Sequence, residues 1–224
     1  MLSPNDAEMA YCCAHYLWRL HRIAELGTAL VAIFSRAPAH APVGGRIDEG
    51  GRTQGTGGVS LFALQFAKMC GARVIATSSG DAKIDRLKLL GADFTLNYKS
   101  TPDWGKKARK LSGHGVDLVV EVGGIGTLNE SIRATKIGGT IAFIGVLAGS
   151  PPAESRILPI VMQQQRLQGV TVGSVEDLQA MVDAIATNRM KPVIDRTFPF
   201  DQVKQAFSYL ASGAHFGKVA ISIG

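Results

Sequence analysis

Two hydrophobic periodicities alternate along most of the chain. Apolar residues spaced three to four positions apart predict amphipathic helices, and short apolar or β-branched runs predict buried strands. Downstream of residue 54 these patterns follow one another, separated by short loops of glycine and polar residues. Helices are predicted over residues 59–69, 81–90, 103–111, 128–137, 157–165, 175–188 and 201–211. Strands or extended runs are predicted over residues 73–77, 94–97, 116–122, 140–144, 169–172, 193–198 and 218–223.

This order of elements predicts the α/β fold class, with a doubly wound parallel sheet of the Rossmann type. We divide the chain into an atypical, partly irregular segment at 1–53, a dinucleotide-binding domain at 54–190 and a C-terminal segment at 191–224. A parallel strand should lead directly into the first glycine-rich loop of such a domain. Residues 47–54 make a poor strand, because they hold charged residues and glycines. Residues 29–34 are the alternative, although the long loop that would follow them argues against it.

The glycine-rich loop reads Gly55-Thr56-Gly57-Gly58-Val59-Ser60. Glycine permits a tight turn and lets backbone N–H groups approach a phosphate, and the following helix directs its positive end at the anion. We therefore predict that this loop binds the pyrophosphate of a nicotinamide dinucleotide. Ser60 stands where the fingerprint has its third glycine, and its small side chain still allows close helix packing. A glycine loop alone is also typical of an ordinary turn, so the prediction depends on the elements around it.

The end of the second predicted strand bears on the choice of cofactor. A site for NAD has an acidic residue about 20 positions after the first glycine, and residues 75–79 contain none. Ser78, Ser79 and Lys83 instead offer hydroxyls and a cation, which suit the 2′-phosphate of NADP. We predict NADP, with NAD as the alternative. An ordinary turn followed by a surface lysine is the competing interpretation, and Asp81 either faces the ribose or caps a helix.

Charge and hydropathy narrow the range of partners. The formal net charge is +6, which fits nucleic acid, a membrane surface or a phosphorylated small molecule. Lys and Arg are spread along the chain, and their densest group, at 106–110, is predicted to be a solvated helix face. The apolar run at 29–34 is far shorter than a membrane span. We expect neither a nucleic-acid nor a membrane partner.

The cysteines point to a reducing compartment. Cys12, Cys13 and Cys70 form no CxxC pair and no disulfide framework. We predict a cytoplasmic location. A structural zinc site uses closely spaced cysteines, and we predict that the chain binds no metal.

Several motifs downstream of residue 54 occur together in one order. They are the glycine loop, Leu90-Gly-Ala-Asp93, Asn97-Tyr98, the stretch from Gly115 to Gly124, Gly138-Gly139 and Ala214-His-Phe-Gly-Lys218. With these motifs, residues 54–224 resemble the medium-chain dehydrogenase/reductase superfamily, above all its zinc-free alcohol-dehydrogenase-like and quinone-oxidoreductase-like branch. The resemblance implies an NAD(P)H-dependent oxidoreductase that transfers hydride to or from a carbonyl, alcohol, enone or quinone. It also implies a homodimer.

The resemblance implies cofactor contacts at matching positions and assigns no catalytic residue. The pyrophosphate would lie against the loop Gly55 to Val59, which includes Thr56, Gly57 and Gly58. The adenosine and 2′-phosphate would lie near Ser78, Ser79, Lys83 and Tyr98. The remaining contacts would come from Val122, Gly123, Gly145 and Val146 on the path to the nicotinamide, Gly173 and Ser174 at its carboxamide, and His215 and Phe216 in the C-terminal loop.

The resembling family also carries a large N-terminal substrate domain, of which only residues 2–7 and Cys12 give a faint trace here. We therefore expect a truncated form with remnants of the second domain, in which residues 191–224 would return to the substrate domain. The alternative to an active oxidoreductase is a catalytically inactive dinucleotide-binding fragment. A methyltransferase would require acidic residues near the glycine loop, and their absence argues against this class of enzyme.

Individual residues keep simpler interpretations as well. Tyr98 fits a surface aromatic, His215 fits a loop histidine, and Glu121 fits a buried, hydrogen-bonded carboxylate. No Ser, His and Asp ordering suggests hydrolysis.

Overall fold

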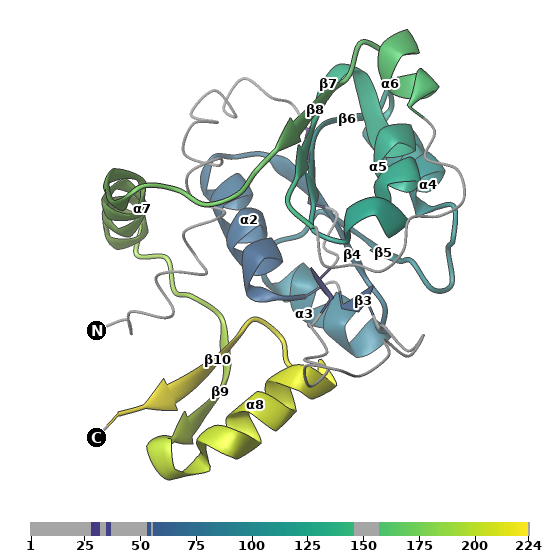
Figure 1. The fold of residues 1–224 in the computed structure, drawn as a ribbon. Helices are drawn as coiled ribbons and strands as arrows, with labels where there is room; N and C mark the ends of the chain where they lie inside the picture. The colour runs from purple at the N-terminus through teal and green to yellow at the C-terminus, as the bar shows by residue number, and fades with distance from the viewer. Residues whose placement is uncertain (1–27, 32–34, 37–52, 55, 146–156, 224) are drawn as a thin grey trace, which may run out of the picture.

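The structure is a computed structural model that describes residues 28–31, 35–36, 53–54, 56–145 and 157–223 (Figure 1). The strands are β1 Thr28–Val31, β2 Ser35–Arg36, β3 Thr53–Gln54, β4 Arg73–Ser78, β5 Phe94–Asn97, β6 Val116–Glu121, β7 Thr135–Phe143, β8 Arg166–Gly169, β9 Ile194–Pro199 and β10 Lys218–Ser222. The helices are α2 Gly58–Met69, α3 Asp81–Leu89, α4 Trp104–Ser112, α5 Leu128–Ala134, α6 Leu158–Met162, α7 Val175–Thr187 and α8 Val203–Ser212, with 3-10 turns η2 Gly124–Gly126 and η3 Phe200–Gln202.

A six-stranded parallel sheet forms the centre of the molecule, in the order β5-β4-β1-β6-β7-β8. Helices α4 and α5 pack together on one side of it, and α2 lies on the other (Figure 1). The chain thus adopts the predicted doubly wound α/β fold. The strand order runs outward from the centre in both directions, so it reverses between β1 and β6. We call this place the switch point.

The first strand of the sheet lies far from the glycine loop in sequence. β1 pairs with β4 on one side, Leu30 opposite Ile75, and with β6 on the other, Leu30 opposite Val119. The alternative at 29–34 therefore supplies the strand, and part of the sheet lies upstream of Gln54, where we placed the domain start. The short strands β2 and β3 then pair antiparallel, Ser35 opposite Gln54, immediately before the glycines.

The core fills both faces of the sheet, because apolar residues from both faces of its central strands are buried. All six residues of β6 are buried, and β4 is buried from its second residue on. Helix α2 contributes Leu61 and Leu64, which are almost fully buried in the same cluster. Burial of α2 against the sheet fixes the helix whose N-terminus carries the glycines.

Several predicted elements differ from the observed ones, and the helix predicted at 157–165 is only the short α6, Leu158–Met162. Helix α5 ends at Ala134 rather than at residue 137, and Thr135 begins β7. The guanidinium of Arg109 and the amide of Gln165 donate to the carbonyl of Thr135, both at 2.8 Å, so these side chains satisfy a backbone group at the end of the helix. The predicted strand at 169–172 is β8 at Arg166–Gly169 instead, because β7 offers partners only up to Phe143, opposite Gly169.

The C-terminal segment forms a separate small unit. β9 and β10 pair in parallel, and α8 packs against both of them (Figure 1). The helix α7 precedes this unit and starts with the capping box that its sequence indicated, in which the hydroxyl of Ser174 accepts from the N–H of Asp177. None of the described helices is long and apolar enough to cross a membrane.

Candidate functional site

The carboxyl ends of the strands meet the glycine loop at the switch point. In open parallel sheets, ligands bind outside the carboxyl ends of the strands where the strand order reverses. Here that place lies between the ends of β1 and β6. The loop before α2 comes from one side and the residues after Glu121 come from the other. The topology therefore brings together the two groups of residues that the sequence assigned to the pyrophosphate and the nicotinamide.

The glycine loop leads into the N-terminus of α2. Gly57 caps the helix in an extended conformation, with φ −77° and ψ 173°, and has no side chain that could cap the first turn. The N-terminus of a twelve-residue helix attracts an anion, because the helix dipole is positive there. The loop is also held from the C-terminal side, because Gly57 and Gly217 form an isolated bridge and the N–H of Gly217 donates to the carbonyl of Thr56 at 2.8 Å.

Buried hydroxyl groups lie beside the glycines and at the carboxyl end of β4. The side-chain oxygens of Thr56, Ser60 and Ser78 are buried and have no hydrogen-bond partner within the described part of the chain. Thr56 and Ser60 flank the glycines, and Ser78 is the last residue of β4, the neighbour of β1. A buried hydroxyl without a partner costs about 1–3 kcal/mol. The cluster is therefore suited to a ligand that carries hydrogen-bonding oxygens.

Lys218 is a further candidate site residue, to which the sequence had given no role. It is only 7% exposed, and its side chain lies against Gly58: a Cβ atom at that glycine would stand 2.3 Å from Cε and 2.5 Å from Nζ of the lysine. A cation beside the positive end of a helix adds to the attraction of that end for an anion. The only sequence signal was its place at the end of the Ala214–Lys218 motif.

The other wall of the site follows β6. Val122 is buried in the main core, and the N–H of Gly123 donates to the Glu121 carboxylate at 2.7 Å. Gly145 lies directly against this loop, since a Cβ atom there would stand 2.3 Å from the carbonyl oxygen of Val122. The structure therefore brings together three of the four residues predicted to line the nicotinamide path. Val146 and the pyrophosphate residue Gly55 lie outside the described residues.

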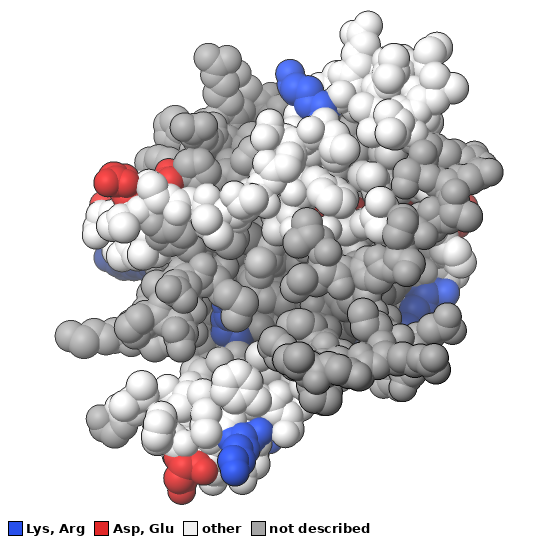
Figure 2. Space-filling view, in the orientation of Figure 1, with Lys and Arg blue, Asp and Glu red and all other residues white. Residues whose placement is uncertain are grey.

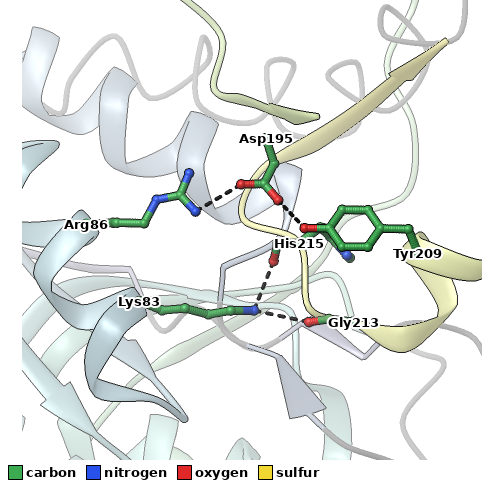
Figure 3. A network of polar contacts seen from close by, with 6 residues as sticks. All are labelled: Lys83, Arg86, Asp195, Tyr209, Gly213 and His215. Atoms are coloured by element: carbon green, nitrogen blue, oxygen red, sulfur yellow. Dashed lines mark hydrogen bonds and ion pairs between the residues drawn. The ribbon is translucent and has the colours of Figure 1, made fainter. Parts of the chain in front are cut away.

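The predicted 2′-phosphate ligand Lys83 lies in a polar network between α3 and the C-terminal unit (Figure 3). Its ammonium donates to the carbonyls of His215 at 2.9 Å and Gly213 at 3.1 Å, and burial lowers its pKa. The guanidinium of Arg86 pairs with Asp195 at 2.9 Å. The two carbonyls use two of the three N–H donors of the ammonium, so a 2′-phosphate would share Lys83 with the C-terminal unit.

Hydrogen bonds to Asp195 and ring packing complete this network. The hydroxyl of Tyr209 donates to Asp195 at 2.7 Å, and Arg86 stacks 3.9 Å above the ring of Phe216. Burial alone would raise the pKa of Asp195, but the hydrogen bonds from Tyr209 and Arg86 lower it below its usual value. The carboxylate thus stays charged and fixes the C-terminal unit to α3.

The remaining predicted residues are placed as follows. Ser79 is half-buried after β4, and the N–H of Tyr98 donates to the carbonyl of Ser78 at 3.1 Å, so Tyr98 lies beside the β4 end and packs against the core. Gly173 precedes Ser174, whose hydroxyl is engaged in the capping box. His215 is buried, its Nδ1 has no partner among the described residues, and burial lowers its pKa.

Metal and nucleic-acid binding find little support in these residues. In the ranges that the structure describes, no three His, Cys, Asp or Glu side chains gather as metal ligands. These residues therefore do not fit a zinc ion, and the absence of metal stays a prediction for the whole chain. On the face shown in Figure 2, the Lys and Arg side chains are scattered rather than gathered over one element.

The comparisons with known proteins agree with this architecture. The family described as zinc-binding dehydrogenase matches residues 58–187, and the chain belongs to this family. A zinc-type alcohol dehydrogenase-like protein, C1773.06c of Schizosaccharomyces pombe, is 46% identical over 173 residues, which cover 75% of this chain and 50% of that protein.

Solved structures give the same result. A structure from Sinorhizobium meliloti 1021 described as an alcohol dehydrogenase superposes with a TM-score of 0.76 and 33% identity, over 95% of this chain and 56% of that one. The structure of an NAD-dependent alcohol dehydrogenase gives a TM-score of 0.75 and 28% identity, with the same coverage of 95% and 56%. The chain therefore spans about half the length of these relatives. Its membership of the alcohol-dehydrogenase-like, medium-chain dehydrogenase/reductase group confirms the resemblance seen in its motifs.

Proposed function

We propose that the protein binds a nicotinamide dinucleotide at the switch point and that it prefers NADPH. The buried, unpaired hydroxyls of Thr56, Ser60 and Ser78 carry this proposal, because a dinucleotide supplies oxygen atoms that can bond them. The positive end of the α2 dipole and the adjacent Lys218 suit the negative charge of a pyrophosphate.

The chain's residues would divide the work of holding the cofactor. Gly57, Gly58 and Lys218 would bind the pyrophosphate, and Ser78, Ser79 and Tyr98 would surround the adenosine. The loop after β6 and Gly145 would position the nicotinamide, with Gly173, Ser174, His215 and Phe216 nearby. When bound, the nicotinamide supplies hydride transfer, while the protein supplies orientation and exclusion of water.

The preference for NADPH rests on the end of β4. No acidic residue follows it at the position that holds a ribose 2′-hydroxyl, and the carboxylate of Asp81 accepts from the amide of Asn97 at 2.8 Å. Ser79 and Lys83 are the polar residues that follow the end of β4 and that could bind a 2′-phosphate. One similar solved structure is NAD-dependent by its name, so NAD is the second candidate.

A single substitution in the glycine loop tests the binding site. Gly57→Val should abolish NADPH binding in a fluorescence titration, because the branched side chain would occupy the space of the pyrophosphate. The extended conformation of Gly57 suits valine, so the fold should survive, as circular dichroism can check. Unchanged affinity with an intact fold would place the ligand elsewhere.

For the whole protein we propose hydride transfer between NAD(P)H and a carbonyl, alcohol, enone or quinone, in the cytoplasm. For the chain itself we propose cofactor binding with weak or no turnover. Large apolar side chains on the C-terminal unit are exposed, including Phe200, Phe207 and Ile223. Such exposed apolar residues indicate a surface that packs against another protein segment, and none of the described residues covers it.

Two assays on the purified chain separate binding from catalysis. We expect NADPH to bind and its oxidation to stay near background with quinones, enones and aldehydes. Turnover near ~10 per second, a typical enzyme value, would contradict the inactive fragment and favour a complete active site.

We also propose a homodimer through the edge of the sheet. All four residues of β8 are exposed, and none of the described strands pairs with its outer edge, which another strand can therefore use. The neighbouring helix α6 exposes Leu158, Val161 and Met162. A monomer by light scattering at micromolar concentration would contradict this assembly.

A further inference from the structure

Glu121 ends β6 at the switch point, and its carboxylate is fully buried. Oε1 accepts from the N–H of Gly123 at 2.7 Å, the N–H of Gly124 at 3.0 Å and the hydroxyl of Thr127 at 2.7 Å. Oε2 accepts from the hydroxyl of Ser131. One side chain therefore holds the start, the middle and the end of the loop 122–127.

The backbone of Glu121 holds the neighbouring loop as well. Its carbonyl accepts from the N–H of Ile144 at 2.8 Å and of Gly145 at 3.1 Å. Gly145 is thereby pressed against the loop 122–127, where only a glycine fits: an added Cβ would lie 2.5 Å from the backbone nitrogen of Gly124. Both loops predicted to line the nicotinamide path thus depend on this residue for their shape.

Burying the Glu121 carboxylate among these donors costs hydration energy that an apolar side chain would not lose, so a structural role alone does not explain it. The partners of the carboxylate are two amides and two hydroxyls, from β6's own loop and from α5, and no cation is among them in the described residues. A buried carboxylate without a cation loses its hydration, and an apolar residue of similar size often gives equal or better stability. The fold of β6 alone does not require an acid at this position.

We propose that Glu121 is a positioning residue for the cofactor: its carboxylate fixes the loop 122–127 in the shape that binds the nicotinamide half, without touching the cofactor itself. This inference rests on the proposed function. Four donors converge on the group, and hydrogen bonds to a charged acceptor are stronger than those to a neutral one. Ionised Glu121 therefore holds the loop more firmly than the protonated acid does.

The consequence is a pH dependence of cofactor affinity that belongs to this residue. Burial raises the pKa of Glu121 to about 7, against the opposing hydrogen bonds from Ser131, Thr127, Gly123 and Gly124. As the pH falls through about 7 the carboxylate takes up a proton, and its bonds to the loop become those of a neutral group. The affinity for NADH, which lacks the titrating 2′-phosphate of NADPH, should therefore fall about three- to tenfold between pH 8.5 and pH 6, the range expected when charge-assisted bonds become neutral ones.

Glu121→Gln tests the proposal, because glutamine keeps the shape and imitates the protonated acid. With NADH as the ligand, which lacks a 2′-phosphate that titrates near pH 6, we expect the variant to keep the weak affinity of the wild type at pH 6 and to show no change up to pH 8.5. Asp183→Asn, an exposed carboxylate on α7, is the matched control and should keep the wild-type profile. A Glu121→Gln variant with wild-type affinity and pH profile would overturn the positioning role.

A second readout does not depend on binding. In the wild type, the amide resonances of Gly123 and Gly124 should shift with a midpoint near 7, and in Glu121→Gln they should not. Amide chemical shifts that stay constant from pH 6 to 8.5 would overturn the proposal, because the hydrogen bonds of the loop to Glu121 would then not depend on its ionisation. Titrating amides in a chain that binds neither NADPH nor NADH would instead refute the proposed function, and with it the role of Glu121 in cofactor binding.

Discussion

The two loops that meet at the switch point are built in different ways. β6 ends at Glu121 and reaches α5 through residues 122–127, with the carboxylate of its last residue holding the turn. β1 ends at Val31, but α2 begins only at Gly58, and the strand pair β2–β3 lies between them. Both connections nevertheless deliver a helix to the same edge of the sheet.

The difference shows what fixes each loop. The loop 122–127 takes its shape from local hydrogen bonds to one residue. The glycine loop takes its position from burial of α2 in the core and from the bridge between Gly57 and Gly217, not from direct continuation of a strand. A glycine fingerprint can thus keep its place in the fold after its covalent link to the first strand has been lengthened.

The largest expected effect comes from restoring that link. Deleting residues 32–53 joins Val31 directly to Gln54 and makes the first loop as short as dinucleotide-binding turns usually are. Because the direct link adds a second anchor for the loop beside the bridge between Gly57 and Gly217, NADPH affinity should rise about tenfold or more. Replacing residues 37–52 by a Gly/Ser segment of equal length is the control and should leave the affinity low. No gain from the deletion would show that the long link does not limit binding.

The second effect tests the tight contact in the other wall. Gly145→Ala should lower both the free energy of unfolding, by about 1–3 kcal/mol, and the NADPH affinity, because the new methyl group meets the backbone of Val122 and Gly124. Gly126→Ala in the same loop is the control, since a Cβ there has no neighbour within 4 Å. Chemical denaturation and a fluorescence titration measure the two quantities. Equal behaviour of the two variants would contradict the close packing of these loops.

A third, smaller effect concerns the cation at the glycine loop. Lys218→Met should weaken NADPH and NADH by a similar factor, about tenfold, because the pyrophosphate is common to both cofactors. Lys204→Met removes an exposed charge from α8 and should change neither affinity. If the variant loses affinity for NADPH and not for NADH, Lys218 binds the 2′-phosphate rather than the pyrophosphate.

The smallest effect concerns cofactor choice. Lys83→Ala should reduce the preference for NADPH over NADH by about 1 kcal/mol, the usual worth of an exposed ion pair. If the two carbonyls of Gly213 and His215 are its true partners, the variant will instead lower the melting temperature and leave the preference unchanged. Equal wild-type affinities for the two cofactors would remove the basis of the NADP prediction.

Local signals predicted much of this fold. β5 at Phe94–Asn97 was predicted with the bounds it has, and α2 and α7 were predicted to within a residue or so, because periodicity and capping act over a few neighbouring positions. The strand β1 was harder to assign, since its four residues carry no sign of the sheet they join. The true end of α5 depends on Arg109 and Gln165, which are remote in sequence.

The site shows the same limit. The glycine loop and the residues after β6 could be predicted because each is a short motif. Lys218 could not be placed beside Gly58 from sequence, because only the bridge between the C-terminal loop and the glycine loop brings them together. The partners of Lys83 in the C-terminal unit were hidden for the same reason.

Hydrogen exchange with and without NADPH tests the central claim most directly, because it locates the ligand on the backbone. The account predicts that saturating NADPH slows exchange in two separate stretches, Gly57 to Leu61 at the start of α2 and Gly123 to Leu128 after β6, in the chain or in its 32–53 deletion variant. Protection confined to the C-terminal unit, or no protection in either protein, would contradict a dinucleotide site at the switch point.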